Sequence, residues 1–160
     1  MIIKLNFLSD KFKTTLDKET INLLEKTLNE FLLKKDEILF NICQEAELTI
    51  HLITDEEIKT VNNERRQKNK ATDVLSWKMY ENELAENYLF GDILISDDYN
   101  IKQSKEKKIS LKEELMFLIT HGFLHLCGYT HENDEDEKVM NMYTLAILKE
   151  IGIDYSKDII

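Results

Sequence analysis

Three histidines within eleven residues are the part of this sequence best suited to chemistry. His121, His125 and His131 lie in the segment HGFLHLCGYTH. His121 and His125 are four residues apart, about one turn of a helix, so both imidazoles project from the same helix face. Gly128 allows the chain to leave the helix and fold back, and His131 follows three residues later. The spacing predicts one metal site with three nitrogen ligands.

This ligand set favours a catalytic zinc site. Three imidazoles leave the fourth tetrahedral position of zinc open for water, as in catalytic rather than structural sites. Zinc lowers the pKa of such a water to about 7, which makes hydroxide available at neutral pH. Imidazole also suits nickel, copper and iron. We therefore expect one Zn²⁺ per chain, with other transition metals such as Ni²⁺ as alternatives.

The same spacing overlaps the metalloprotease signature H-E-x-x-H-x-x-G-x-x-H. In that signature the second residue is the glutamate that acts as the general base of peptide hydrolysis. Gly122 stands at this position here. Because a glycine cannot accept the proton, a zinc metalloprotease is the weaker interpretation.

Two carboxylates are candidates for supporting the ligands. Asp92 interrupts the apolar run LFGDILI, and a buried carboxylate is costly unless it is paired. It accepts a hydrogen bond either from a metal-bound imidazole or from the backbone, and both alternatives stay open. Glu114 precedes His121 by seven residues on the same helical stripe, so it is either solvated or placed behind the ligands. His51 lies on the polar face of a strand pattern and is expected to be an ordinary surface histidine.

Basic residues gather in two segments, although the net charge is −10. An acidic protein binds nucleic acid only where positive charge is concentrated locally. The first segment contains Arg65, Arg66, Lys68 and Lys70, and the second contains Lys102, Lys105, Lys107, Lys108 and Lys112. The second group either lines a groove beside the metal helix or faces solvent.

The elements that must position these residues follow from apolar periodicity. The predicted strands are residues 2–8, 46–53, 73–77 and 89–96. The predicted helices are residues 17–35, 55–65, 97–106, 110–126 and 134–151. The last helix is expected to bury Val139, Tyr143, Ala146, Ile147 and Ile151. The pattern predicts a single α/β (α+β) domain over residues 1–160, with an about four-stranded mixed sheet, about five helices and the metal-binding helix near the C-terminus.

Composition agrees with a soluble protein of one domain. The 160 residues are 42% hydrophobic and 32% charged, which is ordinary for a globular chain. No apolar run approaches the roughly 20 residues that span a bilayer, and the N-terminus lacks the features of a signal peptide. The two cysteines form no C-x-x-C pair, so we expect a reducing cytoplasm and no disulfide framework.

Four segments together resemble the YbeY family. HGFLHLCGYTH followed by ENDEDE resembles the family signature H-G-x-L-H-L-x-G-Y-D-H. VNNERRQKNKATDVLSW (61–77) resembles its segment L-N-x-x-Y-R-x-x-x-x-x-T-D-V-L-S-F, FGDILIS (90–96) its G-D-I strand, and EELMFLITHG (113–122) the approach to the histidines. The resemblance implies a metal-dependent, single-strand-specific endoribonuclease of ribosomal RNA maturation. It further implies small-subunit rRNA 3′-end processing, ribosome quality control, and the small subunit and assembly GTPases as partners.

Carried over residue by residue, the resemblance makes His121, His125 and His131 the metal ligands, with His121 and His125 also in the catalytic set. It gives Arg66 a catalytic role facing the RNA across the cleft. A guanidinium can hold a phosphate bidentately, and Lys68 and Lys70 are expected to bind RNA beside it.

The chain departs from the pattern at Arg65, at Ala71 and at Thr130, which replaces the aspartate before the third histidine.

Metal-assisted cleavage of single-stranded RNA is therefore the expected reaction, with Arg66 neutralising charge on the phosphate. The nucleophile is either water or the ribose 2′-hydroxyl, and no residue stands out as general base. The alternative is a non-catalytic ribosome-assembly factor whose metal holds the C-terminal half together.

Overall fold

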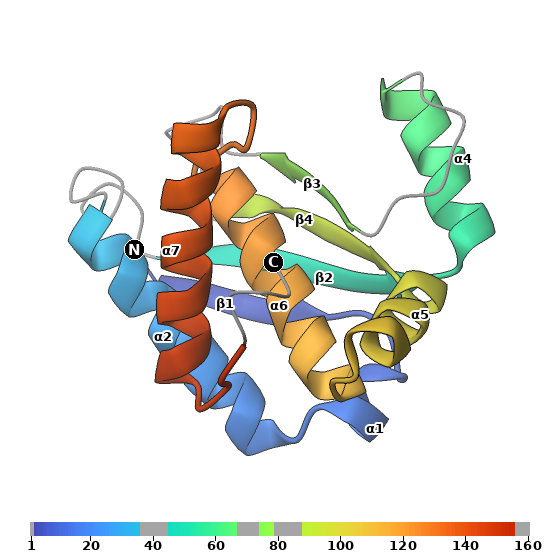
Figure 1. The fold of residues 1–160 in the computed structure, drawn as a ribbon, viewed down its shortest axis with the longest axis horizontal. Coiled ribbons are helices and arrows are strands. Elements are labelled where there is room, and N and C mark those ends of the chain that lie inside the picture. The colour runs from blue at the N-terminus through green and yellow to red at the C-terminus, as the bar shows by residue number, and fades with distance from the viewer. Residues whose placement is uncertain (1, 36–44, 67–73, 79–87, 156–160) are drawn as a thin grey trace.

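The computed structural model contains a four-stranded mixed sheet (Figure 1), as the sequence predicts. It describes residues 2–35, 45–66, 74–78 and 88–155. The strands are β1 (Ile2–Phe7), β2 (Glu45–Ile53), β3 (Val74–Lys78) and β4 (Tyr88–Ser96). Their order in the sheet is β1-β2-β4-β3. The strands β1, β2 and β4 are parallel, whereas β3 pairs with β4 antiparallel.

Six helices lie within the described residues. They are α1 (Phe12–Thr15), α2 (Lys18–Lys35), α4 (Asp55–Arg66), α5 (Asp97–Lys107), α6 (Leu111–Leu126) and α7 (Asp134–Glu150). Every predicted strand and helix is present, with ends that differ by at most one residue. The helix α1 was not predicted, because four residues are too few to show a helical period.

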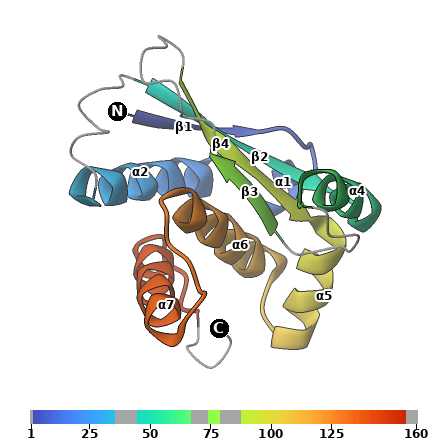
Figure 2. The ribbon, with the colours of Figure 1, turned by 90° about the horizontal axis from the view of Figure 1, so that it is seen from above.

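The helices α2, α6 and α7 lie on one side of the sheet (Figure 2). The residues of β2 alternate accordingly, since successive side chains of a strand point to opposite faces. Ala46, Leu48 and Ile50 are buried in the core, whereas Glu47 and His51 on the other face are only partly buried. The burial of these side chains along β2 thus shows which face of the sheet the helices cover.

The helix α6 crosses the middle of the covered face and is almost wholly buried. Its first turn is fixed by a capping box, in which Ser110 and Glu113 each accept a hydrogen bond from the other's backbone N–H. At Gly122 it packs closely on β4, since an added Cβ would lie 2.9 Å from Cγ2 of Ile93. Any other residue at this position would have to displace the Ile93 side chain. Within the described residues, no helix is both long and apolar enough to cross a membrane.

The helix α7 buries most of the face that was predicted. Ile147 and Ile151 are buried, and Tyr143 is partly buried and packs against the core. Val139 is 40% exposed and Ala146 is also exposed, so the prediction for these two residues was wrong. The helix packs on α6 and α2, and its buried side includes Met140, Thr144 and Leu148 in addition to the predicted Ile147.

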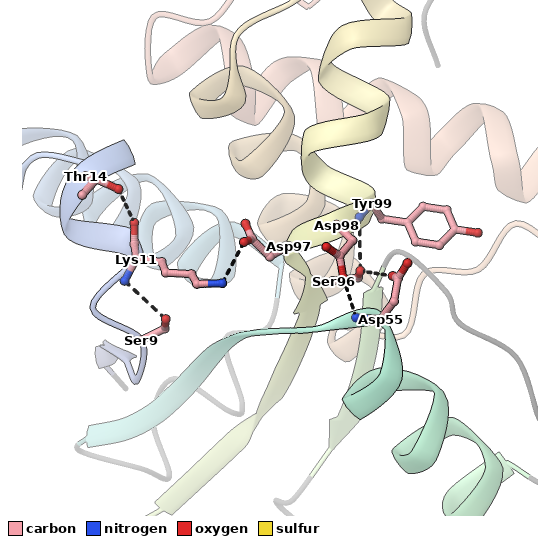
Figure 3. A network of polar contacts seen from close by, with 8 residues as sticks. All are labelled: Ser9, Lys11, Thr14, Asp55, Ser96, Asp97, Asp98 and Tyr99. Carbon is pink, nitrogen blue, oxygen red and sulfur yellow. Dashed lines mark hydrogen bonds and ion pairs between the residues drawn. The ribbon is translucent and has the colours of Figure 1, made fainter.

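Polar side chains at the carboxyl ends of β2 and β4 join the first turns of α4 and α5 (Figure 3). The backbone N–H of Asp55 donates to Oδ2 of Asp98 at 2.9 Å, and the Ser96 hydroxyl donates to Oδ1 of Asp55. Lys11 reaches across from α1's N-terminal side, with its Nζ 3.0 Å from Oδ2 of Asp97. The network ties the two helices to the edge of the sheet at which they begin.

A candidate three-histidine metal centre

The three predicted ligands converge at the C-terminal end of α6. The ring centroids of His121 and His125 are 4.7 Å apart, and that of His131 is 5.5 Å from the first and 5.0 Å from the second. One ligand nitrogen from each ring lies within 4.8 Å of the other two. In the described part of the chain no other group of three or more His, Cys, Asp or Glu side chains is arranged to hold an ion.

The turn after α6 orients His125. The helix ends at Leu126, and Gly128 takes a φ of 96° that side chains disfavour, so the backbone turns back toward the helix. This brings the carbonyl oxygen of Tyr129 to 3.0 Å from Nδ1 of His125. When Nδ1 donates its proton to that oxygen, Nε2 is left as the lone-pair donor that a metal requires.

The loop that carries His131 is held by the start of α7. The Thr130 hydroxyl donates to Oδ2 of Asp136 at 3.2 Å, and the side-chain amide of Asn133 donates to the same oxygen at 2.8 Å. Asn133 also caps α7 by accepting from the backbone N–H of Asp136 at 2.9 Å. The threonine that replaces the aspartate of the family pattern thus pairs with a carboxylate of α7.

His121 is partly buried, as is His125, whereas His131 is exposed. Burial, followed by the neighbouring charges of His125, His131 and Lys107, lowers the pKa of His121 from 6.5 to about 3. Its Nδ1 atom is buried and has no hydrogen-bond partner. An imidazole that stays neutral at physiological pH, with a nitrogen that the protein leaves unpaired, has the chemistry of a metal ligand. The donor set therefore fits a transition-metal ion.

Glu114 is buried rather than solvated, so that alternative of the prediction is wrong. Its side chain is 0% exposed, and both carboxylate oxygens lie 3.1 Å from Nζ of Lys107. Oε2 also accepts a hydrogen bond from the Tyr155 hydroxyl at 3.0 Å. The ring of Phe117 lies between this cluster and His121, with a centroid 5.5 Å from the imidazole.

Asp92 does not lie beside the metal ligands. Its neighbour Ile93 points at Gly122 of α6, so Asp92 points to the opposite face of the sheet. There its Oδ1 is 3.8 Å from Nε2 of His51, and the two side chains are 34% and 31% exposed. The apolar run around Asp92 suggested burial, but only alternate residues of β4 face the core. The proposed contact of Asp92 with a metal-bound imidazole is therefore contradicted.

The basic residues of the first segment cannot be placed against the histidines. Arg66 is the last residue of α4, its side chain is outside the described residues, and so are Lys68 and Lys70. Figures 1 and 2 both show α4 well away from the C-terminal end of α6.

In the second basic segment the lysines do not act together. Lys102, Lys105 and Lys108 are exposed on or just after α5, whereas Lys107 turns inward to Glu114. Sequence reasoning missed the roles of Lys107 and Tyr155. The local pattern gave no signal for Tyr155, which lies 41 residues from Glu114.

Comparison with known proteins gives a consistent result. The family model described as "Endoribonuclease YbeY" matches residues 6–152. A protein of that name from Oceanobacillus iheyensis is 37% identical over 148 residues, which cover 88% of this chain and 93% of the relative. One from Finegoldia magna is 32% identical over 155 residues, covering 96% and 95%.

A solved structure has the same fold. The solution structure of TM1509 from Thermotoga maritima matches with a TM-score of 0.56 and covers 93% of this chain and 91% of its own. The two sequences are 23% identical, so the likeness concerns the fold alone.

Proposed function

This chain belongs to the endoribonuclease YbeY family, and on that premise we propose that it cleaves single-stranded RNA at a metal centre formed by His121, His125 and His131. The observation that carries the proposal is the convergence of three imidazole nitrogens within 4.8 Å of one another. His131 is the exposed member of the cluster. A large substrate can therefore approach the three histidines from solvent on this side.

The three histidines would hold one Zn²⁺, and Ni²⁺ suits the same nitrogen ligands. Such an ion, when bound, supplies a Lewis acid for the phosphate and lowers the pKa of a coordinated water. Other groups of the chain set the protonation and the orientation of these ligands. Burial holds His121 neutral, and the Tyr129 carbonyl fixes the orientation of the His125 ring.

Arg66, Lys68 and Lys70 are proposed to bind the RNA. The support is the match of their segment to the family pattern and the ability of guanidinium and ammonium groups to bind phosphate. The family resemblance also assigns Arg66 to neutralising charge on the scissile phosphate, which requires one RNA strand to contact both the end of α4 and the histidines. An Arg66→Ala variant should keep its metal content and lose RNA affinity or cleavage, and unchanged RNA affinity and rate would remove this residue from the site.

The cellular role proposed for this activity is ribosomal RNA processing in the cytoplasm, at the 3′ end of the small-subunit rRNA, and ribosome quality control. The small ribosomal subunit and assembly GTPases are the proposed partners. These proposals rest on the family resemblance. The acidic overall charge of −10 is compatible with them only if binding is confined to the basic segment, because phosphate contacts need local positive charge.

A protease is not favoured by the geometry around Gly122. The position where a metalloprotease carries its glutamate faces β4, and a Cβ there would meet Ile93 at 2.9 Å. A glutamate there would have to displace the Ile93 side chain. The chain therefore lacks the base, and the packing at this position disfavours one.

The deciding experiment is RNA cleavage by protein purified without an affinity tag, with elemental analysis before and after chelation. We expect a single-stranded rRNA fragment to be cut by the metal-loaded protein and not by the chelated protein or by a folded His121→Ala variant. A 2′,3′-cyclic phosphate product would identify the ribose hydroxyl as nucleophile, and a 5′-phosphate would identify water. A variant that unfolds on losing His121 would instead support the assembly factor with a structural metal.

A further inference from the structure

A buried ion pair lies one aromatic ring away from the ligand His121 of the proposed metal centre. Lys107, in the last turn of α5, places its ammonium 3.1 Å from both carboxylate oxygens of Glu114 in the first turn of α6. The Tyr155 hydroxyl completes the cluster. It accepts from Lys107 at 2.8 Å and donates to Glu114 at 3.0 Å. Glu114 is fully buried, and Lys107 is 20% exposed.

One aromatic ring connects this cluster to the first ligand. Phe117 stacks on Tyr155, with centroids 4.8 Å apart and planes at 7°. The other neighbour of Phe117 is the His121 ring, at 5.5 Å. Nζ of Lys107 lies 4.8 Å from the Phe117 centroid. Glu114, Phe117 and His121 follow one another along a single face of α6, because they are three and four residues apart.

Stability alone does not account for a buried ion pair at this place. Removing two charges from water is costly, and apolar residues of similar volume often serve folding equally well. The position of the pair matters more. An ammonium close behind a site that takes a divalent cation repels that cation, unless an opposite charge cancels it.

We propose that Glu114 is a positioning residue for the metal centre, which cancels the charge of Lys107 behind His121 and, with Tyr155, holds Phe117 against the ligand ring. The inference rests on the proposed metal centre and extends it to the C-terminal segment. Tyr155 follows the last helix, so the end of the described chain becomes part of the support for His121. Groups that orient or tune metal ligands commonly change metal affinity by about 10- to 100-fold when they are removed.

The test measures Zn²⁺ affinity by competition with a chromophoric chelator, using tag-free full-length protein. Glu114→Gln leaves the ammonium of Lys107 uncancelled, and we expect the affinity to fall about 10-fold. Lys107→Met removes the repelling charge, and we expect an affinity at least equal to that of the original chain. The double variant Lys107→Met with Glu114→Gln restores neutrality and should recover most of the affinity lost in the Glu114→Gln variant.

A purely structural role makes a different prediction. If the cluster only holds α5 and α6 together, both single variants weaken the affinity and the double variant is no better than either. That result would overturn the proposal. Should Glu114→Gln fail to fold, Lys107→Met decides alone, because a folded Lys107→Met protein with weakened affinity contradicts the charge argument.

Two controls separate this inference from the proposals on which it rests. Leu24→Ala removes a fully buried side chain of α2, so it destabilises the fold without touching the cluster, and the affinity of its folded fraction should be unchanged. His121→Ala should abolish tight binding. If His121→Ala binds Zn²⁺ normally, the metal centre itself is wrong; if it loses binding while Glu114→Gln retains it, only the role of Glu114 fails.

Discussion

The two ends of the sheet carry polar clusters of opposite character. At the carboxyl ends of β2 and β4, Asp55, Ser96 and Asp98 are engaged with one another and with helix N-termini (Figure 3). At the other end, where Phe123 of α6 stacks on Phe90 near the start of β4, the imidazoles converge and a buried nitrogen of His121 has no partner. The carboxyl edge is where ligands commonly bind in open α/β sheets. Here the residues that could hold a metal ion lie at the opposite end.

The difference has a physical cause. Two helices begin at the carboxyl edge, and the partial positive charge of their N-termini attracts carboxylates. Oδ2 of Asp98 accepts from the backbone N–H of Asp55, and the Ser96 hydroxyl accepts from that of Tyr99, so these groups stabilise the first turns of the two helices. The histidines instead lie in the C-terminal part of one buried helix and after a glycine turn, where their ligand nitrogens converge. A polar cluster is therefore a candidate metal site when its ligand atoms converge, and not because it contains many charged groups.

Removing a ligand is the largest expected effect and tests this contrast directly. We expect His125→Ala to reduce Zn²⁺ affinity by more than about 100-fold, because a ligand matters more than the groups that support ligands. His51→Ala is the matched control, since His51 lies on the other face of the sheet beside Asp92 and should change neither affinity nor RNA cleavage. Equal losses in the two variants, measured by chelator competition, would contradict the assignment of the site.

Substituting Gly122 should damage the fold at the histidine end. Gly122→Ala puts a methyl 2.9 Å from Ile93 Cγ2, and overpacking of this kind costs about 1–3 kcal/mol of unfolding free energy. Urea denaturation measures the loss. We also expect weaker metal binding, because His121 is the adjacent residue. Gly152→Ala is the control: no atom lies within 4 Å of its added Cβ, and any cost there comes from its φ of 80° and should leave metal affinity unchanged.

Acid should weaken the metal-free protein through His121. Its pKa is 6.5 when unfolded and about 3 when folded, so the unfolded chain binds more protons between these values and stability falls as the pH drops through this window. Between pH 7 and pH 5 the loss is about 2 kcal/mol from this group. Denaturation curves of chelated protein at the two pH values measure it. A His121→Gln variant should show a smaller difference, and an equal one would assign the effect to other groups.

The sequence predicted well what depends on near neighbours in the chain. The histidine cluster needs only helical spacing and the glycine turn, and both are local. The structure confirms that His121, His125 and His131 lie close together. Element ends were also predicted well, because the capping pairs at residues 54 and 110 are local signals.

What the sequence could not give is the partner of each polar side chain. Asp92 lies in an apolar run, but the run does not say that only one face of β4 is covered. Glu114 has the expected helix position, yet its partners are Lys107 on the preceding helix and Tyr155 beyond the last one. For Val139 the helix was predicted correctly, but the side chain is 40% exposed and not buried. Each miss depends on the packing of elements distant in the chain, which periodicity does not encode.

The smallest expected effect comes from removing a helix cap at the carboxyl edge of the sheet. Ser96 caps α5 by accepting from the backbone N–H of Tyr99 at 3.2 Å and also donates to Asp55. Ser96→Ala should cost about 1–2 kcal/mol of stability without changing metal affinity. Ser110→Ala makes the same chemical change at the start of α6. There the first turn carries Glu114, so a loss of similar size should be accompanied by weaker Zn²⁺ binding. If Ser96→Ala weakens binding as much as Ser110→Ala does, the two ends of the sheet are energetically coupled. The division between a structural edge and a chemical end would then be wrong.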